Sequence, residues 1–466
     1  MRISRRYMLA GLGSSLMASQ MPGLSLAQTA DGFLELIAAP SKQKLYRQDG
    51  PASDLWTYNG SAPGPEIRVE RGQRVKVRFT NRLSEPTSVH WHGIRIENGM
   101  DGVSGLTQPP VMPGESFVYD FVAPDAGTFW YHAHNKSWNQ VSRGLYGPLI
   151  VDEAKPVFSK DRDITLVIDD WRLAGEGVLD VASLGSMMEW AHAGRMGNWL
   201  TVNGMQKPSI DLVRGQVYRL RLINAANARV FAIDPSRFNA KLIGYDGQSF
   251  IDPQPAHYAP LMLGPSQRVD LMVTADTDFA LEELSGGNPF AMAVFKSVGD
   301  PATARTAPAI KLQPNELPAP DLTNPRRLKL DMTGGAMGGM GDIVYQGKML
   351  SGEDIRATRQ VWAFNGVANL AKEPYFRAER GETILLETIN NTAWMHAIHI
   401  HGHHFQVLTR SGSEIDEGRP WRDTFMIGPQ QVTQIAFIAD NPGKWLLHCH
   451  MLEHAAAGMN TYFEVS

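Results

Sequence analysis

The feature that most limits how this chain can fold is a unit that occurs three times along it. Each copy starts with an aromatic segment ending in Asn-Gly, continues past a proline, and reaches an Arg-Gly pair that precedes an apolar strand and another asparagine. The Arg-Gly pairs begin at Arg71, Arg214 and Arg380, which are 143 and 166 residues apart. A period of this length is the size of a whole domain rather than of a solenoid repeat. The 466-residue chain is therefore expected to form three related domains.

The residues within each unit favour strands over helices. Apolar and charged residues alternate after the first two Arg-Gly turns, at 75–79 (VKVRF) and 218–222 (YRLRL). Alternation with a period of two indicates a half-buried antiparallel strand. Glycine, proline and asparagine interrupt the apolar runs at short intervals, and long helical periodicity is scarce. We therefore expect an all-β protein built from three tandem β-sandwiches.

Shifts in composition place the expected domain boundaries. One boundary falls near residues 152–155, and the next falls in a linker with six prolines between residues 301 and 325. The predicted domains are 31–155, 156–300 and 326–466, with the linker at 301–325 and a leader at 1–30.

The leader carries an export pattern. Residues 4–9 (SRRYML) form a twin-arginine pattern, followed by a modest apolar region and by small residues near Ala27. The apolar region is too short to span a bilayer, and no later stretch is a candidate. We expect a twin-arginine signal peptide, recognised by the export machinery, and a protein that is periplasmic or otherwise exported.

Charge and cysteine content exclude several classes of function. The net charge of −4 argues against a nucleic-acid partner and against a polybasic membrane surface. A single cysteine excludes disulfides within the chain. We expect a monomer with small-molecule partners.

That cysteine lies in a histidine-rich run near the C-terminus, residues 448–454 (HCHMLEH), with Met459 five residues further on. If the run is extended, as the apolar residues before it suggest, His448 and His450 face one side of the strand and the Cys449 thiolate faces the other. One cysteine, two histidines and a methionine as weak axial ligand form the ligand set of a blue-copper electron-transfer site. The strand would then offer a thiolate to one metal and two imidazoles to another.

Eight of the fourteen histidines form four His-x-His pairs. Within a strand each pair presents two imidazoles on one face. Eight imidazoles that converge need a metal, because they would otherwise be buried polar groups without partners. Such sites suit copper, zinc, iron or nickel, although one thiolate cannot make the cysteine-based structural zinc sites. The pairs are His90 with His92, His132 with His134, His399 with His401, and His448 with His450, whereas the middle unit has only His192 and His257.

Taken together, these motifs resemble the four copper motifs of the three-domain multicopper oxidases, the group of laccases, bilirubin oxidase and bacterial copper-efflux oxidase. The similar segments are 90–93 (HWHG), 130–134 (WYHAH), 396–403 (HAIHIHGH) and 448–459, in the family's order. The resemblance covers the chain from about residue 33 onward. It implies three cupredoxin-like Greek-key β-sandwich domains. One departure is Ala397, where many relatives have proline; it affects local backbone stiffness and no ligand.

The resemblance also implies the ligand sets of four coppers: one type 1, one type 2 and a type 3 pair. The type 1 copper is expected on His396, Cys449, His454 and axial Met459. The type 2 copper is expected on His90 and His399. The type 3 pair is expected on His92, His132, His134, His401, His448 and His450.

The implied activity couples the one-electron oxidation of a donor to the four-electron reduction of O₂ to water. The trinuclear cluster is expected between the first and third domains, because each contributes four of its eight histidines, and the middle domain would act as spacer and scaffold. Cys449 would receive the electron at the type 1 copper, and His448 and His450 would pass it to the type 3 pair. The thioether of Met459 is expected to keep the type 1 potential below that of relatives without a coordinating residue there.

Two carboxylates near these motifs are candidates for proton handling. Asp101, eleven residues after His90, matches an acidic position near the type 2 copper in many relatives, where it would relay protons or orient a water. The alternative is an aspartate that forms a turn before Gly102. Glu453, beside His454, is expected to be a solvated loop residue.

The sequence leaves the donor open. Thioethers prefer Cu(I), so a methionine-rich, glycine-rich loop would suit a cuprous oxidase in copper homeostasis, but methionine also fills gaps in cores. The competing donors are phenols and aromatic amines, with Trp394 and Met395 lining their site. The candidate loop contains Met332, Met337, Met340 and Met349, and a second loose group contains Met187, Met188, Met196 and Met205.

Two other functions compete with an oxidase. A copper-storage or folding-assistance protein could use the same scaffold without turnover, but the twelve intact ligands argue against it. A copper nitrite reductase uses type 1 and type 2 coppers but needs neither eight trinuclear histidines nor three domains.

Overall fold

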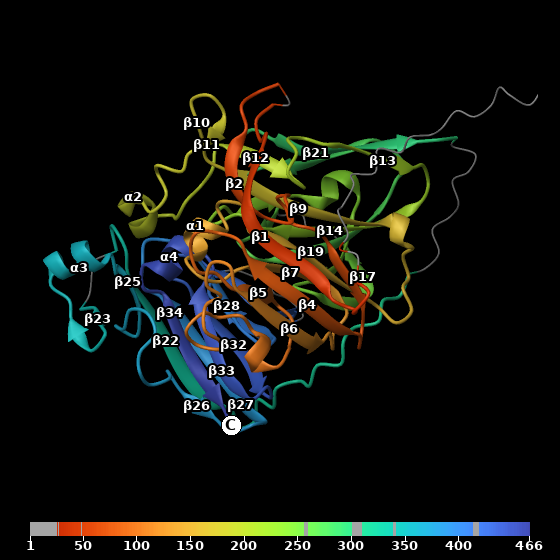
Figure 1. The fold of residues 1–466 in the computed structure, drawn as a ribbon. Helices are drawn as coiled ribbons and strands as arrows, with labels where there is room; N and C mark the ends of the chain where they lie inside the picture. Colours follow the sequence, from red (N-terminus) through yellow and green to blue (C-terminus); the bar gives the residue numbers. More distant parts are fainter. Residues whose placement is uncertain are drawn as a thin grey trace, which may run out of the picture.

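The computed structural model describes residues 26, 28–47, 49–255, 260–300, 310–338, 342–412 and 419–466. Strands dominate these residues and gather into three parts that follow one another along the chain (Figure 1). The expected signal peptide up to residue 25, residues 301–309 of the expected linker, His257 and Met340 lie outside the described residues. Within the described ranges, no helix is both long enough and apolar enough to cross a membrane.

The first part is a sandwich of two four-stranded sheets with strand orders β2-β1-β4-β6 and β3-β8-β7-β5. Its hydrophobic core lies between them and includes Phe79, Trp91 and Tyr131. The strands are β1 (Leu34–Gln43), β2 (Ser53–Tyr58), β3 (Ile67–Glu70), β4 (Arg74–Asn81), β5 (Val89–His92), β6 (Ser116–Val122), β7 (Gly127–Ala133) and β8 (Tyr146–Asp152). The short helices of this part are η1 (Asn98–Met100) and α1 (Ser137–Gln140).

The middle part has one six-stranded sheet, β12-β9-β14-β19-β16-β17, and a smaller sheet, β13-β21-β20. Two strand pairs, β10-β11 and β15-β18, add to it. The elements are η2 (Lys160–Arg162), β9 (Asp163–Trp171), β10 (Leu173–Ala174), β11 (Val178–Leu179), α2 (Met187–Ala191), β12 (Trp199–Val202), β13 (Ser209–Val213), β14 (Val217–Asn224), β15 (Phe231–Ile233), η3 (Pro235–Phe238), β16 (Lys241–Tyr245), β17 (Gln248–Pro255), β18 (Leu261–Leu263), β19 (Arg268–Thr274), β20 (Phe279–Glu283) and β21 (Phe290–Val298).

The third part pairs a six-stranded sheet, β25-β22-β27-β32-β29-β30, with a five-stranded sheet, β26-β34-β33-β28-β31. Its core contains both Cys449 and Met459. The elements are β22 (Arg326–Gly334), β23 (Val344–Tyr345), β24 (Lys348–Met349), α3 (Gly352–Thr358), β25 (Trp362–Phe364), β26 (Arg377–Ala378), β27 (Glu382–Asn390), β28 (His396–Ile400), β29 (Phe405–Arg410), β30 (Trp421–Arg422), β31 (Thr424–Ile427), β32 (Val432–Ala439), β33 (Gly443–Cys449), α4 (Leu452–Ala456) and β34 (Asn460–Val465).

The threefold repeat in the sequence is also a repeat in the structure. The sheet segments β2-β1-β4, β12-β9-β14 and β25-β22-β27 each join an antiparallel pair to a parallel one. The asparagines of the Asn-Gly turns, Asn59, Asn203 and Asn365, all have positive φ, which asparagine tolerates better than most residues. Each asparagine side chain bonds two main-chain groups of the neighbouring strand. The aromatic segment with Asn-Gly therefore fixes the same turn in each part.

The expected half-burial holds for β4 but not for β14. Inward and partly exposed residues alternate along β4, whereas every residue of β14 is buried. Arg219 and Arg221 of β14 do not face solvent, because the first part covers that face and the two side chains pair with Glu153, Asp163 and Asp270. Arg219 and Arg221 of β14 are thus members of buried ion pairs at the interface between the first and middle parts.

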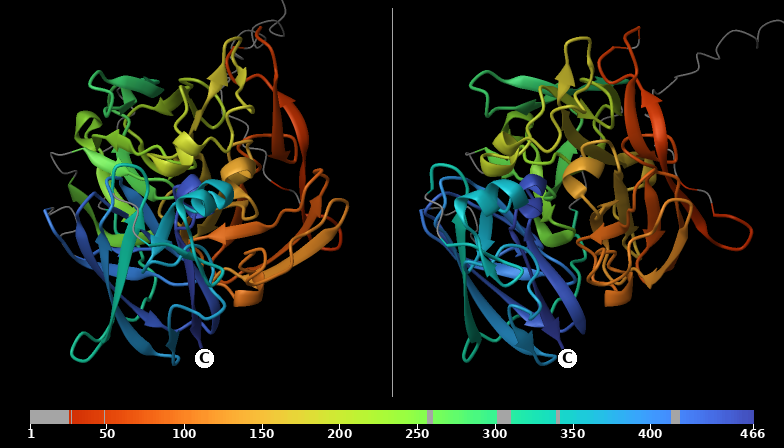
Figure 2. Two further views of the ribbon diagram at one scale, coloured as in Figure 1. Left: turned by 90° about the vertical axis from the view of Figure 1, so that its left-hand side faces the viewer. Right: turned by 60° about the vertical axis from the view of Figure 1, so that its left-hand side comes forward.

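The first and third parts lie side by side, and the middle part lies across both, as the two turned views also show (Figure 2). One buried cluster joins the parts: it contains Trp130 of the first part, Trp171 and Ile223 of the middle part, and Leu452 of the third. This arrangement brings β5 and β7 of the first part opposite β28 and β33 of the third.

Candidate metal centres

A cysteine and two histidines meet inside the third part. Pairing of β28 with β33 sets Ile398 opposite Cys449, so that His396, two residues before Ile398, lies near the cysteine. The Cys449 Sγ atom is 3.6 Å from His396 Nδ1 and 3.8 Å from His454 Nδ1, and the two Nδ1 atoms are 3.0 Å apart. His454 comes from α4, which follows β33. All three side chains are wholly buried.

The other ring nitrogens of this site already have partners. His396 Nε2 is 2.9 Å from the hydroxyl of Thr392, and His454 Nε2 donates to the carbonyl of His192 at 2.6 Å. Burial raises the pKa of Cys449 to about 12 and lowers that of His454 to about 4. The three side chains therefore point their metal-binding atoms at one another. The two imidazoles are neutral, as metal binding requires, and a soft or borderline cation would hold Cys449 as the thiolate. Met459 is wholly buried, and its carbonyl accepts a bond from the Cys449 N–H at 3.0 Å.

The four His-x-His pairs also converge, at the boundary between the first and third parts. Two pairs come from β5 and from the end of β7, and the other two come from the ends of β28 and β33, with His134, His401 and His450 each directly after its strand. The rings of His90 and His401 stack with centroids 3.9 Å apart, and those of His92 and His399 stack at 3.8 Å. The stacked rings in each case belong to different parts of the fold, so these four histidines meet between the first and third parts.

Two pairs of imidazole nitrogens face each other directly. His401 Nε2 is 3.1 Å from His448 Nε2, and His132 Nε2 is 3.3 Å from His450 Nε2. The Nδ1 atoms of His448 and His132 donate to the carbonyls of Cys449 and Ala133, at 2.9 and 3.1 Å. In that tautomer their Nε2 atoms carry lone pairs, which a cation between the rings would satisfy.

The eight-histidine cluster fits copper because it has neutral imidazole nitrogens without hydrogen-bond partners. Burial lowers the pKa of seven of the eight histidines, to about 4 for His448, so these imidazoles are neutral ligands near pH 7. Buried polar atoms without a partner are otherwise rare. Here five ring nitrogens lack one: His90 Nε2, His92 Nδ1, His134 Nε2, His399 Nε2 and His450 Nδ1.

Asp101 lies within this cluster. Its carbonyl accepts from His90 Nδ1 at 2.7 Å, and its carboxylate lies 3.0 Å from His401 Nδ1. The turn interpretation is supported, because Gly102 has positive φ and an added Cβ there would lie 1.8 Å from the Val89 carbonyl oxygen; the proton-handling role stays a prediction. The turn is what brings the aspartate against the histidines.

Asp423 is a second aspartate in the cluster, and sequence reasoning missed it. It lies between β30 and β31; its carbonyl accepts from His399 Nδ1 at 2.9 Å, and its Oδ1 lies 3.3 Å from His92 Nε2. This arrangement repeats that of Asp101 in the other part of the fold. The available signal was the charged pair Arg422 and Asp423, which interrupts the run at 421–427 (WRDTFMI).

Glu453 is buried rather than solvated, which corrects the expectation. It belongs to α4, and its carboxylate accepts from the Arg195 N–H at 3.1 Å and from the Asn227 side chain at 2.7 Å. Burial raises its pKa to about 7. Glu453, which the sequence predicted to be a loop residue, therefore joins α4 to the middle part.

The methionines divide into buried and exposed ones. Met332 is wholly buried in the core of the third part, where it fills space, whereas the Met337 side chain is 77% exposed and Met349 is 52% exposed. The turn that carries Met337 contacts the end of α2, because the Ala336 N–H donates to the Ala191 carbonyl at 2.7 Å. This bond brings the Met337 turn to the helix that carries Met187 and Met188, and Met188 is 66% exposed.

Sequence comparisons identify the class of protein that combines this fold with these clusters. Family models described as multicopper oxidase match residues 40–156, 162–283 and 347–466. The chain belongs to the multicopper oxidase family, and it is accordingly an oxidoreductase that uses copper, O₂ and a reducing substrate.

Individual relatives cover most of the chain. It is 30% identical over 446 residues to multicopper oxidase MmcO of Mycobacterium tuberculosis, covering 88% of this chain and 83% of that protein. It is 29% identical to laccase-1 of Botryotinia fuckeliana, over 89% of this chain and 79% of that one. Among solved structures, a multi-copper oxidase from Pseudomonas Thermotolerans superposes with a TM-score of 0.80 at 32% identity, covering 95% of this chain and all of that chain.

Proposed function

We propose that the chain oxidises a donor one electron at a time at a type 1 copper and reduces O₂ to water at a trinuclear cluster between its first and third domains. The type 1 ligands would be His396, Cys449, His454 and Met459, and the eight paired histidines would hold the other three coppers. The observation that carries this proposal is the position of Cys449. Its sulfur faces His396 and His454, while its two sequence neighbours reach the eight-histidine cluster.

The bound coppers would supply one-electron redox chemistry at one site and storage of several electrons at the other. The chain supplies the connection between them. Cys449 is bonded covalently to His448 and His450, and the His448 Nδ1–H···O=C bond to Cys449 closes a second, shorter path of 2.9 Å. Wholly buried Cys449 and nearly wholly buried His448 and His450 keep this path away from water.

Asp101 would orient ligands and hold protons for oxygen reduction. Its carbonyl fixes His90 with Nε2 free, and its carboxylate contacts Nδ1 of His401, whose Nε2 faces His448 Nε2. Partners of this kind orient metal-binding histidines in other proteins. A carboxylate within hydrogen-bond distance of the cluster can also pass protons to it.

For the donor, we propose a surface above the type 1 site that is formed by Met188, His192, Met337 and Trp394. The His192 carbonyl bonds the ligand His454, and the rings of His192 and Trp394 lie 5.4 Å apart. Exposed thioethers favour Cu(I) as the donor, and the Trp394 ring favours a phenol or aromatic amine.

The test compares turnover with Cu(I) and with a phenol in wild type and in a Met188→Ala, Met337→Ala double variant. The control is Met205→Ala, a methionine that is 41% exposed in the turn after β12. A loss with Cu(I) alone supports the cuprous donor. Unchanged Cu(I) turnover in the double variant means that these thioethers do not serve the donor.

We further propose that the chain is a monomer exported by the twin-arginine route, with domains at 31–155, 156–300 and 326–466. Strand β8 ends at Asp152 and β22 begins at Arg326, which supports two of these boundaries. An Arg5→Lys, Arg6→Lys variant should stay in the cytoplasm with its leader uncleaved. Export of that variant at the wild-type level would contradict the signal.

The function itself is tested by copper loading. Wild type should bind four coppers per chain and turn blue, and Cys449→Ser should lose the blue band and turnover while it keeps the three coppers of the cluster. A colourless wild type, or a Cys449→Ser variant that turns over donor, would contradict the proposed path.

A further inference from the structure

The middle domain reaches the histidine cluster through one buried arginine. Arg268, at the start of β19, is wholly buried. Its Nε donates to the Thr128 carbonyl of the first part at 3.0 Å, and its Nη1 donates to the Ser266 carbonyl of the middle part at 3.1 Å. The guanidinium also grips both carboxylate oxygens of Asp423 in the third part, at 2.9 and 2.5 Å. One side chain therefore bonds all three parts.

The partner of this arginine faces two of the cluster histidines. Asp423 Oδ1 is 3.3 Å from His92 Nε2, and its carbonyl holds His399 Nδ1. The His92 Nδ1 atom is buried without a partner, so His92 would bind metal through Nδ1 while its Nε2–H donates to Asp423. His92 comes from the first part and His399 from the third, so Asp423 sets the relative orientation of ligands from both.

The backbone beside His92 is shaped around the same pair. A Cβ added to Gly93 would lie 2.2 Å from Arg268 Nη2 and 2.5 Å from Asp423 Oδ2. Gly93 also has positive φ. The structure therefore requires glycine at position 93, because the Arg268 and Asp423 side chains pack directly against the main chain there.

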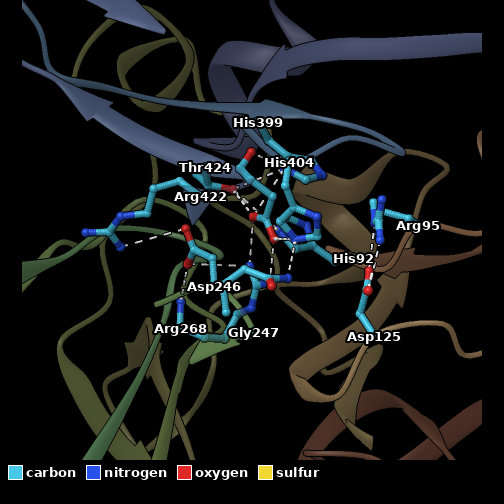
Figure 3. A network of polar contacts seen from close by, with 12 residues as sticks. His92, Arg95, Asp125, Asp246, Gly247, Arg268, His399, His404, Arg422 and Thr424 are labelled. Atoms are coloured by element: carbon cyan, nitrogen blue, oxygen red, sulfur yellow. Dashed lines mark hydrogen bonds and ion pairs between the residues drawn. The ribbon is translucent and has the colours of Figure 1, made fainter. Parts of the chain in front are cut away.

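The arginine has its own support on the middle domain. The Asp246 carboxylate accepts from the Arg268 N–H at 2.9 Å and lies 3.7 Å from its Nη1. Arg422 lies 3.8 Å from the other Asp246 oxygen. Figure 3 shows Arg268 and Asp246 close together, with His92, His399 and Thr424 across from them. Asp246 therefore supports Arg268 at its main chain and lies near its Nη1 atom.

We propose that Arg268 is a positioning residue for the trinuclear centre: by fixing the Asp423 carboxylate with a bidentate grip, it orients His92 and His399 toward the coppers. The proposal rests on the proposed trinuclear cluster and adds a role for the middle domain beyond that of spacer. A planar guanidinium can make this grip, whereas a lysine ammonium is a single point charge that cannot.

The test is Arg268→Lys, which keeps the charge and removes the fork. We expect it to keep the blue band and the reduction of the type 1 copper by donor. We expect fewer than four coppers per chain, a changed or missing type 2 signal in electron paramagnetic resonance, and a fall in O₂ consumption of at least about tenfold, within the range seen when outer partners of metal ligands are removed.

The matched control is Arg221→Lys. Arg221 is also wholly buried on the middle domain and also bonds Thr128, through its hydroxyl at 2.8 Å, but its carboxylate partners are Asp163 and Asp270. A purely structural role for such arginines would affect both variants alike. We expect Arg221→Lys to change the unfolding temperature without changing the type 2 signal.

Four coppers per chain and an unaltered type 2 signal in Arg268→Lys would overturn the proposal. The same loss of the blue band and of the type 2 signal in Arg268→Lys and in Arg221→Lys would also overturn it. Should Arg268→Lys not fold, Asp423→Asn tests the same contact, and retention of its full copper content and type 2 signal would likewise overturn the proposal. A wild-type protein without a blue band or O₂ uptake would instead contradict the proposed function, and the two failures are therefore separable.

Discussion

At the scale of single residues, the cluster is organised by two aspartates that act in the same way. Asp101 and Asp423 each use the main-chain carbonyl to fix one histidine and the side chain to face another. The first comes from the first part of the fold and the second from the third. In both cases the bond to Nδ1 leaves the Nε2 atom of the histidine, His90 or His399, without a partner and available for a metal.

Asp101→Asn should separate the two copper sites in function. The amide keeps the shape and the main-chain bond to His90, but it weakens the contact with His401 and removes a proton-holding group. We expect O₂ consumption to fall by about 10- to 100-fold, with the rate of type 1 reduction by donor unchanged. Stopped-flow reduction and oxygen-electrode measurements on the same sample check this, and wild-type O₂ consumption would contradict the role.

The convergence of the paired histidines and the opposite facing of Cys449 could be predicted from the sequence, because strands alternate faces and a spacing of two residues already fixes which side chains point together. Asp423 could not. It contacts His92, which lies 331 positions earlier in the chain, and neither residue type nor spacing relates the two. Only the packing of the first part against the third brings them together.

At the scale of elements, strand β14 shows what an alternating sequence pattern can and cannot predict. Alternation predicted which residues share a face, and that was correct. What covers the face depends on the neighbouring domain, so Arg219 and Arg221 are buried ion pairs rather than solvated charges. Glu453 on α4 differs from expectation for the same reason, because the middle part covers the helix.

The ion pairs of this interface predict how stability depends on pH. Burial alone would raise the pKa of Asp163, but Arg221, Arg219 and Arg68 lower it well below its ordinary 3.8. A carboxylate with a lowered pKa stabilises the fold above its unfolded pKa, and this contribution is lost as the pH falls below about 3.8 toward the folded value.

Asp163→Asn should therefore destabilise the protein at pH 7 by about 3–5 kcal/mol, because it leaves buried arginines without their partner. The difference from wild type should shrink as the pH falls below about 3.8. Denaturant titrations at several pH values measure this. The control Asp278→Asn removes the exposed partner of Lys296 and should change little. A difference that grows in acid would contradict the assignment.

At the scale of the whole molecule, the middle part does more than hold the others apart. It provides the His192 carbonyl to His454, Asn227 to Glu453, and Arg268 to Asp423. Each contact joins residues more than 150 positions apart along the chain. The sequence predicted three similar domains and the place where the first meets the third. It did not predict these contacts made by the middle domain.

Because both clusters are formed only in the folded protein, copper should stabilise it by mass action. Removal of copper with a chelator is expected to lower the temperature of unfolding, and added copper should restore it. Calorimetry of the loaded, depleted and reloaded protein provides the comparison. Identical unfolding temperatures in all three states would mean that copper does not bind to the folded clusters.

The most direct measurement of the central claim is the number of donor electrons consumed per O₂ by the copper-loaded protein. A lone thiolate connected to eight converging imidazoles predicts four one-electron donors oxidised for each O₂, with water as the product and no hydrogen peroxide released. Two donors per O₂ with hydrogen peroxide as the product, or copper binding without any O₂ uptake, would contradict it.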